Sequence, residues 1–159
     1  MNNENSSRQY LVDLIAALRA LNLAYHHAHT LASGPNFAGD HALLQRLYFG
    51  EDEDGADSPI LEIDTVMEKL QGLLPREPLH ADEIAFAVAD AFQQNKAPDT
   101  VDGRFQQLLR FEKGLQGVLV DAIAHFEAEV PDPGVANMLQ TIVDDRQTNI
   151  YLLQQRLGK

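Results

Sequence analysis

Apolar residues recur at three- and four-residue steps along most of this chain, which is the spacing of one buried helix face. The first such pattern runs from Ser6 to Ser33. Ser6 and Gln9 form a capping box at its start, and Gly34-Pro35 ends it. The inward face comprises Leu11, Leu14, Ile15, Leu18, Leu21, Tyr25 and Ala28. The pattern predicts one long amphipathic helix.

A second helical pattern follows Asn36, which we expect to cap it. Its apolar positions are Phe37, Leu43, Leu44, Leu47 and Tyr48. The pattern stops at Gly50, before the acidic run Glu51–Asp57. Because like charges repel and Gly55 breaks helices, we interpret this run as a solvated loop.

In the middle of the chain, the residue pattern predicts a third helix and a shorter fourth one. Ser58-Pro59 pairs a cap with a proline at the first helical position. Pro75 and Pro78 end this helix, and a shorter one over His80–Gln94 fills the connection. The inward positions of the third helix are Ile63, Val66, Met67, Leu70 and Leu74.

Two further long helices complete the chain. One starts at Thr100 and continues to about Val130, and the other runs from Gly134 to Leu157 after the break at Pro131–Pro133. The inward positions of the former are Phe105, Leu108, Leu109, Leu115, Leu119, Ala122, Ile123 and Phe126. Those of the latter are Val135, Met138, Leu139, Ile142, Ile150, Leu153 and Leu157, with Arg146 interrupting the stripe.

No alternating strand pattern competes with this layout. Two helices, a broken crossover and two more helices are the arrangement of a bundle with one long connection. The sequence therefore predicts an all-α, ferritin-like four-helix bundle with a short extra helix in the long middle connection. We expect a single domain over residues 1–159.

The amino-acid composition limits which kinds of functional site and partner the chain can have. The chain has no cysteine, which excludes disulfides, thiolate metal sites and cysteine nucleophiles, so any metal must bind nitrogen and oxygen. No apolar stretch is long enough to span a membrane and the N-terminus is not signal-like, so we expect a cytoplasmic location. The 24 acidic and 12 basic residues give a formal charge of −12, which repels phosphate and concentrates cations.

Two segments carry a family resemblance. The segment from His29 to His41 holds a Gly-Pro-Asn-Phe turn, Gly34–Phe37, between two histidines. Downstream, Asp64–Leu70 holds an aspartate and a glutamate four positions apart. Together with the helical layout, these features resemble the signature of the Dps family, the DNA-protection-during-starvation miniferritins.

The resemblance implies a ferroxidase that assembles as a hollow homo-oligomer, a dodecamer. Such cages oxidise Fe(II) with hydrogen peroxide or oxygen, store ferric iron and protect against oxidative stress. Their site lies between two subunits. It would take nitrogen ligands from His29 and His41 of one chain and carboxylate ligands from Asp64 and Glu68 of its two-fold partner.

The residue chemistry agrees with iron as the substrate. Imidazole and carboxylate ligands suit iron, and residues four apart, such as Asp64 and Glu68, share a helix face. The gap between His41 and Asp64 is longer than is usual in the family, with Glu51–Asp57 as the insertion. A register change caused by this insertion could replace Asp64 with Asp57 or Glu62 as the ligand.

Other histidines have simpler interpretations. We interpret His26 and His27 as structural or exposed, although His27 is near enough in sequence to assist the site. Asp121 and His125 form another pair four residues apart that could bind metal. Because they lack further partners in the sequence, we interpret them as surface residues.

Two alternatives remain open. Thr30 stands where the family commonly has tryptophan, and Gln45 where an acidic residue is frequent. These departures favour a non-catalytic ferritin-like shell, structural or partner-binding, with a degenerate metal site. DNA binding is not expected, since the first twenty residues hold only Arg8 and Arg19 as basic groups.

Overall fold

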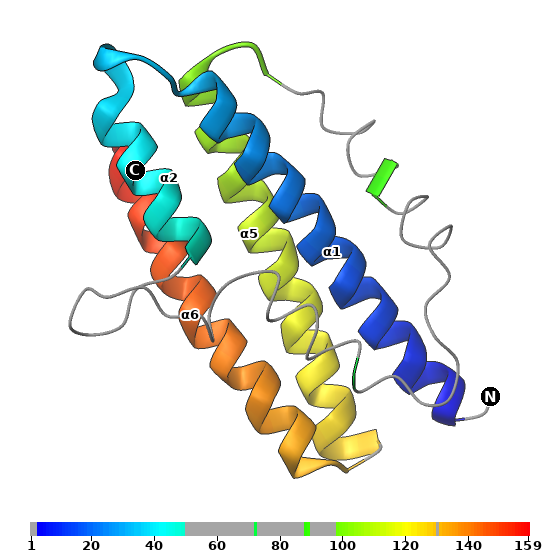
Figure 1. The fold of residues 1–159 in the computed structure, drawn as a ribbon. Helices are drawn as coiled ribbons and strands as arrows, with labels where there is room; N and C mark the ends of the chain where they lie inside the picture. Colours follow the sequence, from blue (N-terminus) through cyan, green and yellow to red (C-terminus); the bar gives the residue numbers. More distant parts are fainter. Residues whose placement is uncertain (1–2, 50–71, 73–87, 90–97, 130) are drawn as a thin grey trace.

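The computed structural model describes residues 3–49, 72, 88–89, 98–129 and 131–159 (Figure 1). The longer helices of these segments run nearly parallel or antiparallel, and the shorter α2 lies alongside α6. This is the predicted ferritin-like helical bundle. Its helices are α1 (Asn3–Leu31), α2 (Ala38–Phe49), α5 (Val101–Ala124) and α6 (Pro133–Leu157), with a 3-10 turn at Pro35–Phe37 and a π-helical turn at His125–Glu129.

The predicted inward faces form the core. All seven apolar residues proposed for the first helix are buried. So are all eight proposed for the helix that starts at Thr100, of which seven lie in α5 and Phe126 lies in the π-helical turn. Leu14, Leu21, Phe105, Leu119 and Leu139 have no exposed surface at all. In α6, Val135, Met138 and Leu157 are only partly buried but still pack against this core. Burial of these stripes supplies most of the energy that holds the bundle together.

The N-terminal boundaries of the first two helices differ from the sequence expectation. The capping box of Ser6 and Gln9 is wrong, because α1 already begins at Asn3; no glycine or proline interrupts the residues before Ser6. Gln9 instead donates its amide to Asp13, at 2.8 Å. Asn36 does not cap α2 either, because Pro35 starts a 3-10 turn that contains it.

The last two helices are capped by side chains. Thr100 Oγ1 accepts a hydrogen bond from the Gly103 amide at 3.0 Å, and Asp132 Oδ1 accepts one from the Val135 amide at 3.1 Å. Helix α6 thus begins at Pro133, one residue before the predicted start, because a proline in the first turn needs no hydrogen-bond donor. The preceding helix does not stay α-helical to its end but changes to the π-turn at His125.

The predicted third helix, the short fourth helix and the acidic loop lie outside the described residues, apart from helical backbone at Gly72 and Val88–Ala89. Those expectations stay predictions. In the segments that the structure describes, no helix is both long and apolar enough to cross a membrane.

Candidate metal site

The two histidines of the motif meet between α1 and α2. His29 lies in the last turn of α1 and His41 in the first turn of α2. Between them Gly34 has a φ of 91°, a backbone conformation that L side chains rarely adopt, and it lets the chain reverse direction. As a result, His29 Nε2 and His41 Nε2 lie 3.0 Å apart. The structure thus brings these two side chains together, and their role as metal ligands stays a prediction.

A backbone carbonyl sets the orientation of one imidazole. His41 Nδ1 lies 3.3 Å from the carbonyl oxygen of Ala32, which can accept its proton. This contact favours the tautomer in which His41 Nε2 carries a free lone pair. His29 Nε2 then donates to that lone pair. When a cation takes the position between them, the His29 proton must move to Nδ1, so that both Nε2 atoms present lone pairs.

The same surroundings keep His29 uncharged. Burial lowers the pKa of His29, and the nearby imidazoles of His41 and His26 lower it further. A neutral imidazole is the form that binds metal. His29 is therefore in the form that can bind a cation near neutral pH.

The nitrogen separation fits a shared ion. Two nitrogens that each lie about 2.1 Å from one metal at a right angle are about 3.0 Å apart. The observed Nε2 to Nε2 distance is 3.0 Å. These two side chains can thus act as neighbouring ligands of a single ion without moving far.

The carboxylates proposed for the site cannot be placed. Asp64 and Glu68, and the alternatives Asp57 and Glu62, all lie outside the described residues. Within the described part of the chain, no three histidine, aspartate or glutamate side chains gather closely enough to hold a metal. The histidine pair is therefore the part of the proposed site that the described residues supply.

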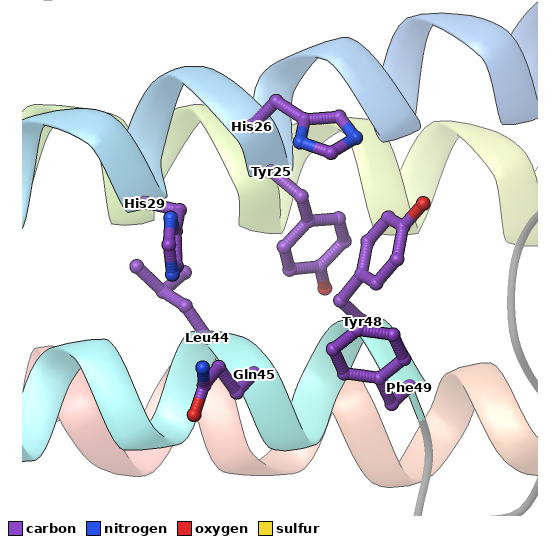
Figure 2. A pocket seen from close by; sticks show the side chains of 7 residues that line it. All are labelled: Tyr25, His26, His29, Leu44, Gln45, Tyr48 and Phe49. Atoms are coloured by element: carbon purple, nitrogen blue, oxygen red, sulfur yellow. The ribbon is translucent and has the colours of Figure 1, made fainter.

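A pocket of about 200 Å³ opens beside His29. In Figure 2, His29 and Gln45 lie at one end of it, and the rings of Tyr25, Tyr48 and Phe49 lie at the other. Leu44 and His26 complete the lining. Thr30 is exposed and donates its hydroxyl to the His26 carbonyl at 2.9 Å. Its side chain has no aromatic ring that could cover the site. The walls are mostly aromatic, and the amide of Gln45 adds no charge.

A buried polar cluster behind the pocket was not predicted. Glu112 of α5 is fully buried, and its Oε1 accepts hydrogen bonds from Tyr25 Oη at 2.7 Å, Arg146 Nη1 at 3.3 Å and Asn149 Nδ2 at 3.3 Å. Asn149 Nδ2 also donates to the Leu47 carbonyl at 2.9 Å. The cluster therefore ties all four described helices together. The one signal in the sequence was Arg146, a cation in an apolar stripe that needs a buried anion.

Burial and neighbouring charges both shift the pKa values of this cluster. Burial raises the pKa of Glu112, although Arg146 and the hydrogen bonds from Tyr25 and Asn149 act in the opposite direction. Burial and the adjacent Glu112 also raise the pKa of Tyr25 well above its ordinary value. Burial alone would lower the pKa of Arg146, but the carboxylates of Glu112 and Asp145 outweigh it and raise the pKa. Arg146 is thus a permanent cation, and Tyr25 keeps its proton.

The surface interpretation of His125 is wrong. Its side chain is buried at the start of the π-helical turn, whereas Asp121 is exposed as expected. His125 Nδ1 lies 2.9 Å from Glu129 Oε2, and Nε2 lies 2.9 Å from Ser7 Oγ. The first turns of α1 cover this ring, since the Tyr10 ring centroid lies 4.6 Å away. His125 thus joins the end of α5 to the start of α1, whereas His29 lies in the last turn of α1.

Comparison with known proteins supports the fold. No protein-family model matches the sequence, and no curated protein matches it either. Among solved structures, a mutant of Dps1 from Mycobacterium smegmatis superposes with a TM-score of 0.73. The match covers 98% of this chain and 97% of that one at 14% sequence identity. The chain therefore has a Dps-like, ferritin-like fold, as the motif in residues 29–41 led us to expect.

Proposed function

We propose that this protein is a cytoplasmic miniferritin that binds and oxidises Fe(II) and stores ferric iron in a hollow cage of identical subunits, a dodecamer. Hydrogen peroxide or oxygen takes the electrons, so the activity protects against oxidative stress. The observation that carries the proposal is the 3.0 Å approach of His29 Nε2 to His41 Nε2 within a Dps-like fold.

Each group has a separate task in this proposal. His29 and His41 supply two neighbouring nitrogen lone pairs, and the Ala32 carbonyl holds the second imidazole in the right tautomer. Asp64 and Glu68 of a two-fold partner would complete the coordination with oxygen ligands, which suit iron and leave open positions for the oxidant. The excess of 24 acidic over 12 basic residues draws cations toward the cage.

The alternative function is a ferritin-like shell without catalysis. It is favoured by Gln45, which places a neutral amide on the wall of the pocket beside His29. A shell protein would assemble, but Fe(II) in its presence would be oxidised no faster than in buffer without protein. The two functions therefore differ in the rate of iron oxidation and not in the size of the assembly.

The test is aerobic and peroxide-driven Fe(II) oxidation, followed by the growth of ferric absorbance. We expect His29→Ala and His41→Ala each to slow the reaction at least about tenfold, the scale on which weakened ligation reduces metal-site activity. His27→Ala is the matched control, because it removes an exposed imidazole from the same helix. Wild-type rates in both ligand variants would contradict the proposed site, and a wild-type protein no faster than buffer would favour the shell.

A further inference from the structure

Ser7, His125 and Glu129 form a hydrogen-bonded chain where the start of α1 meets the π-helical turn at the end of α5. His125 Nε2 lies 2.9 Å from Ser7 Oγ, and His125 Nδ1 lies 2.9 Å from Glu129 Oε2. A hydroxyl, an imidazole and a carboxylate thus follow one another at the separations of a nucleophile, its base and the group that orients the base. The proposed iron chemistry does not use these three residues.

The carboxylate sets the direction of both hydrogen bonds. An ionised carboxylate only accepts, so a neutral His125 carries its proton on Nδ1 and donates it to Glu129. His125 Nε2 then has a lone pair and accepts the hydrogen bond that the Ser7 hydroxyl donates. This is the tautomer in which a histidine can take the proton of a serine nucleophile.

The imidazole is enclosed, whereas the hydroxyl is within reach of a small molecule. His125 is only 2% exposed, and the ring centroids of Tyr10 and Phe126 lie 4.6 Å and 5.0 Å from its own. Ser7 is only partly buried, and the Glu129 side chain is 67% exposed. The base is therefore held by packing on both sides of the contact, and the nucleophile is open to solvent.

The first turn of α1 supplies hydrogen-bond donors close to Ser7. The helix begins at Asn3, so Ser7 lies in its second turn. Side chains on a helix lean toward its N-terminus, and the amides of the first turn have no carbonyl partner within the helix. Negative charge that develops on a group attached to Ser7 is thus close to the positive end of the helix dipole, which stabilises it.

We propose that Ser7, His125 and Glu129 form a hydrolytic site for small carboxylic esters that are uncharged or cationic. Ser7 is the nucleophile, His125 is the general base, and Glu129 is a positioning residue. The exposed carboxylates of Glu127 and Glu129 and the formal charge of −12 disfavour anionic esters. This activity is separate from the proposed iron oxidation and does not depend on it.

The reaction needs no other reactant than water. Ser7 Oγ forms a bond to the acyl carbon while its proton moves to His125 Nε2. The ester C–O bond breaks, and His125 gives the proton to the leaving oxygen, so that an alcohol departs and Ser7 carries the acyl group. Water then attacks the acyl carbon and gives a proton to His125 Nε2. The bond to Ser7 Oγ breaks, the proton returns to Ser7, and the carboxylic acid leaves.

The first test is labelling of the full chain with a fluorophosphonate, which loses fluoride when an activated serine oxygen attacks its phosphorus. Peptide mass spectrometry locates the adduct. We expect Ser7 to react at least about a hundred times faster than Ser33, an exposed serine after α1. His125→Gln should lower the Ser7 rate at least about a hundredfold, the lower range for loss of a general base. Ser33→Ala is the matched control and should leave the Ser7 rate unchanged.

Two results of the labelling would overturn the proposal. One is a Ser7 rate no higher than that of Ser33, and the other is a Ser7 rate that His125→Gln does not change. Circular dichroism first establishes that the His125→Gln protein is folded. If it is not, Glu129→Gln decides, because this side chain is exposed; it should lower the Ser7 rate at least about tenfold while the Ser33 rate stays the same.

The second test reads the tautomer directly. Side-chain 15N NMR of the wild-type protein, with the His125 signals assigned by their loss in His125→Gln, shows which ring nitrogen carries the proton. We expect a protonated Nδ1 and an unprotonated Nε2. A proton on Nε2 would make the Ser7 hydroxyl an acceptor and would overturn the proposal.

The third test is hydrolysis of p-nitrophenyl acetate, followed by nitrophenolate absorbance and by acetylation of Ser7. We expect Ser7→Ala to remove both the initial burst and the acetyl adduct. An equal rate in Ser7→Ala would overturn the proposal, because exposed imidazoles such as His26 and His27 would then account for the hydrolysis. The anionic p-nitrophenyl hemisuccinate should react more slowly than the acetate, and a faster reaction would contradict the proposed class of substrate.

Discussion

At the scale of single residues, two pairs of side chains meet across different helices of the bundle. His29 and His41 present adjacent nitrogens at the surface of α1 and α2, and Glu112 and Arg146 place opposite charges in the core. The motif revealed the first pair because both residues flank a recognisable turn. The second pair could not be read from the sequence, since a glutamate 34 positions before an arginine has no local signature. Its pairing depends on how α5 packs against α6.

The buried ion pair gives a prediction about stability. Arg146→Met leaves Glu112 as an uncompensated buried carboxylate, which costs about 3 to 5 kcal/mol at neutral pH. Burial already raises the pKa of Glu112 in the folded state, and removing Arg146 raises it further. A raised folded-state pKa means that stability is greatest at low pH and falls as pH rises. The cost of Arg146→Met should therefore be smaller near pH 5 than at pH 7.

Denaturant unfolding at both pH values measures this effect. The matched control is Arg146→Met combined with Glu112→Gln, which removes both charges and should recover part of the lost stability. The loss in free energy of unfolding caused by Arg146→Met could also be the same or larger at acidic pH. In that case the unpaired carboxylate of Glu112 would not be the cause of the destabilisation.

At the scale of elements, ion pairs of Arg156 link the end of α6 to two other helices. Its Nε lies 2.5 Å from Asp40 Oδ1 of α2, and its Nη2 lies 2.8 Å from Asp102 Oδ1 of α5. The guanidinium also lies 4.8 Å from the centre of the Phe105 ring. Asp40 directly precedes His41, so this contact helps to hold the start of α2.

Arg156→Gln should therefore loosen α2 as well as lower stability. Because the side chain is partly exposed, we expect a loss of only about 1 kcal/mol in the free energy of unfolding. Hydrogen exchange at the α2 amides should rise more than at the α5 amides. Arg110→Gln, an exposed arginine on α5, is the matched control. Equal exchange in α2 for both variants would show that Arg156 does not fasten this helix.

The helices themselves were largely predictable, because a three- to four-residue period of apolar side chains persists in α1, α5 and α6. Their ends were harder to predict. Ser6 matches a capping box, yet the helix continues back to Asn3, since local capping signals compete with helix propagation. The burial of His125 in the π-helical turn was not foreseen, because the side chain packs against Ser7 and Tyr10, which are far away in the sequence.

At the scale of the whole molecule, the formal charge of −12 disfavours binding to negatively charged partners such as DNA. We expect no gel shift with plain duplex DNA at about 0.15 M salt, where weak phosphate contacts are screened. A clear shift under these conditions would contradict this expectation and would point to a basic surface that the charge balance conceals.

The central claim is that one site is built from two chains, and complementation between inactive subunits tests it most directly. One variant carries His29→Ala with His41→Ala, and the other carries Asp64→Ala with Glu68→Ala. Each alone should oxidise Fe(II) no faster than buffer. After co-refolding in equal amounts, random two-fold pairing should restore about a quarter of the wild-type sites. Recovery of that size supports a shared site. No recovery, with both variants folded and assembled, would contradict it.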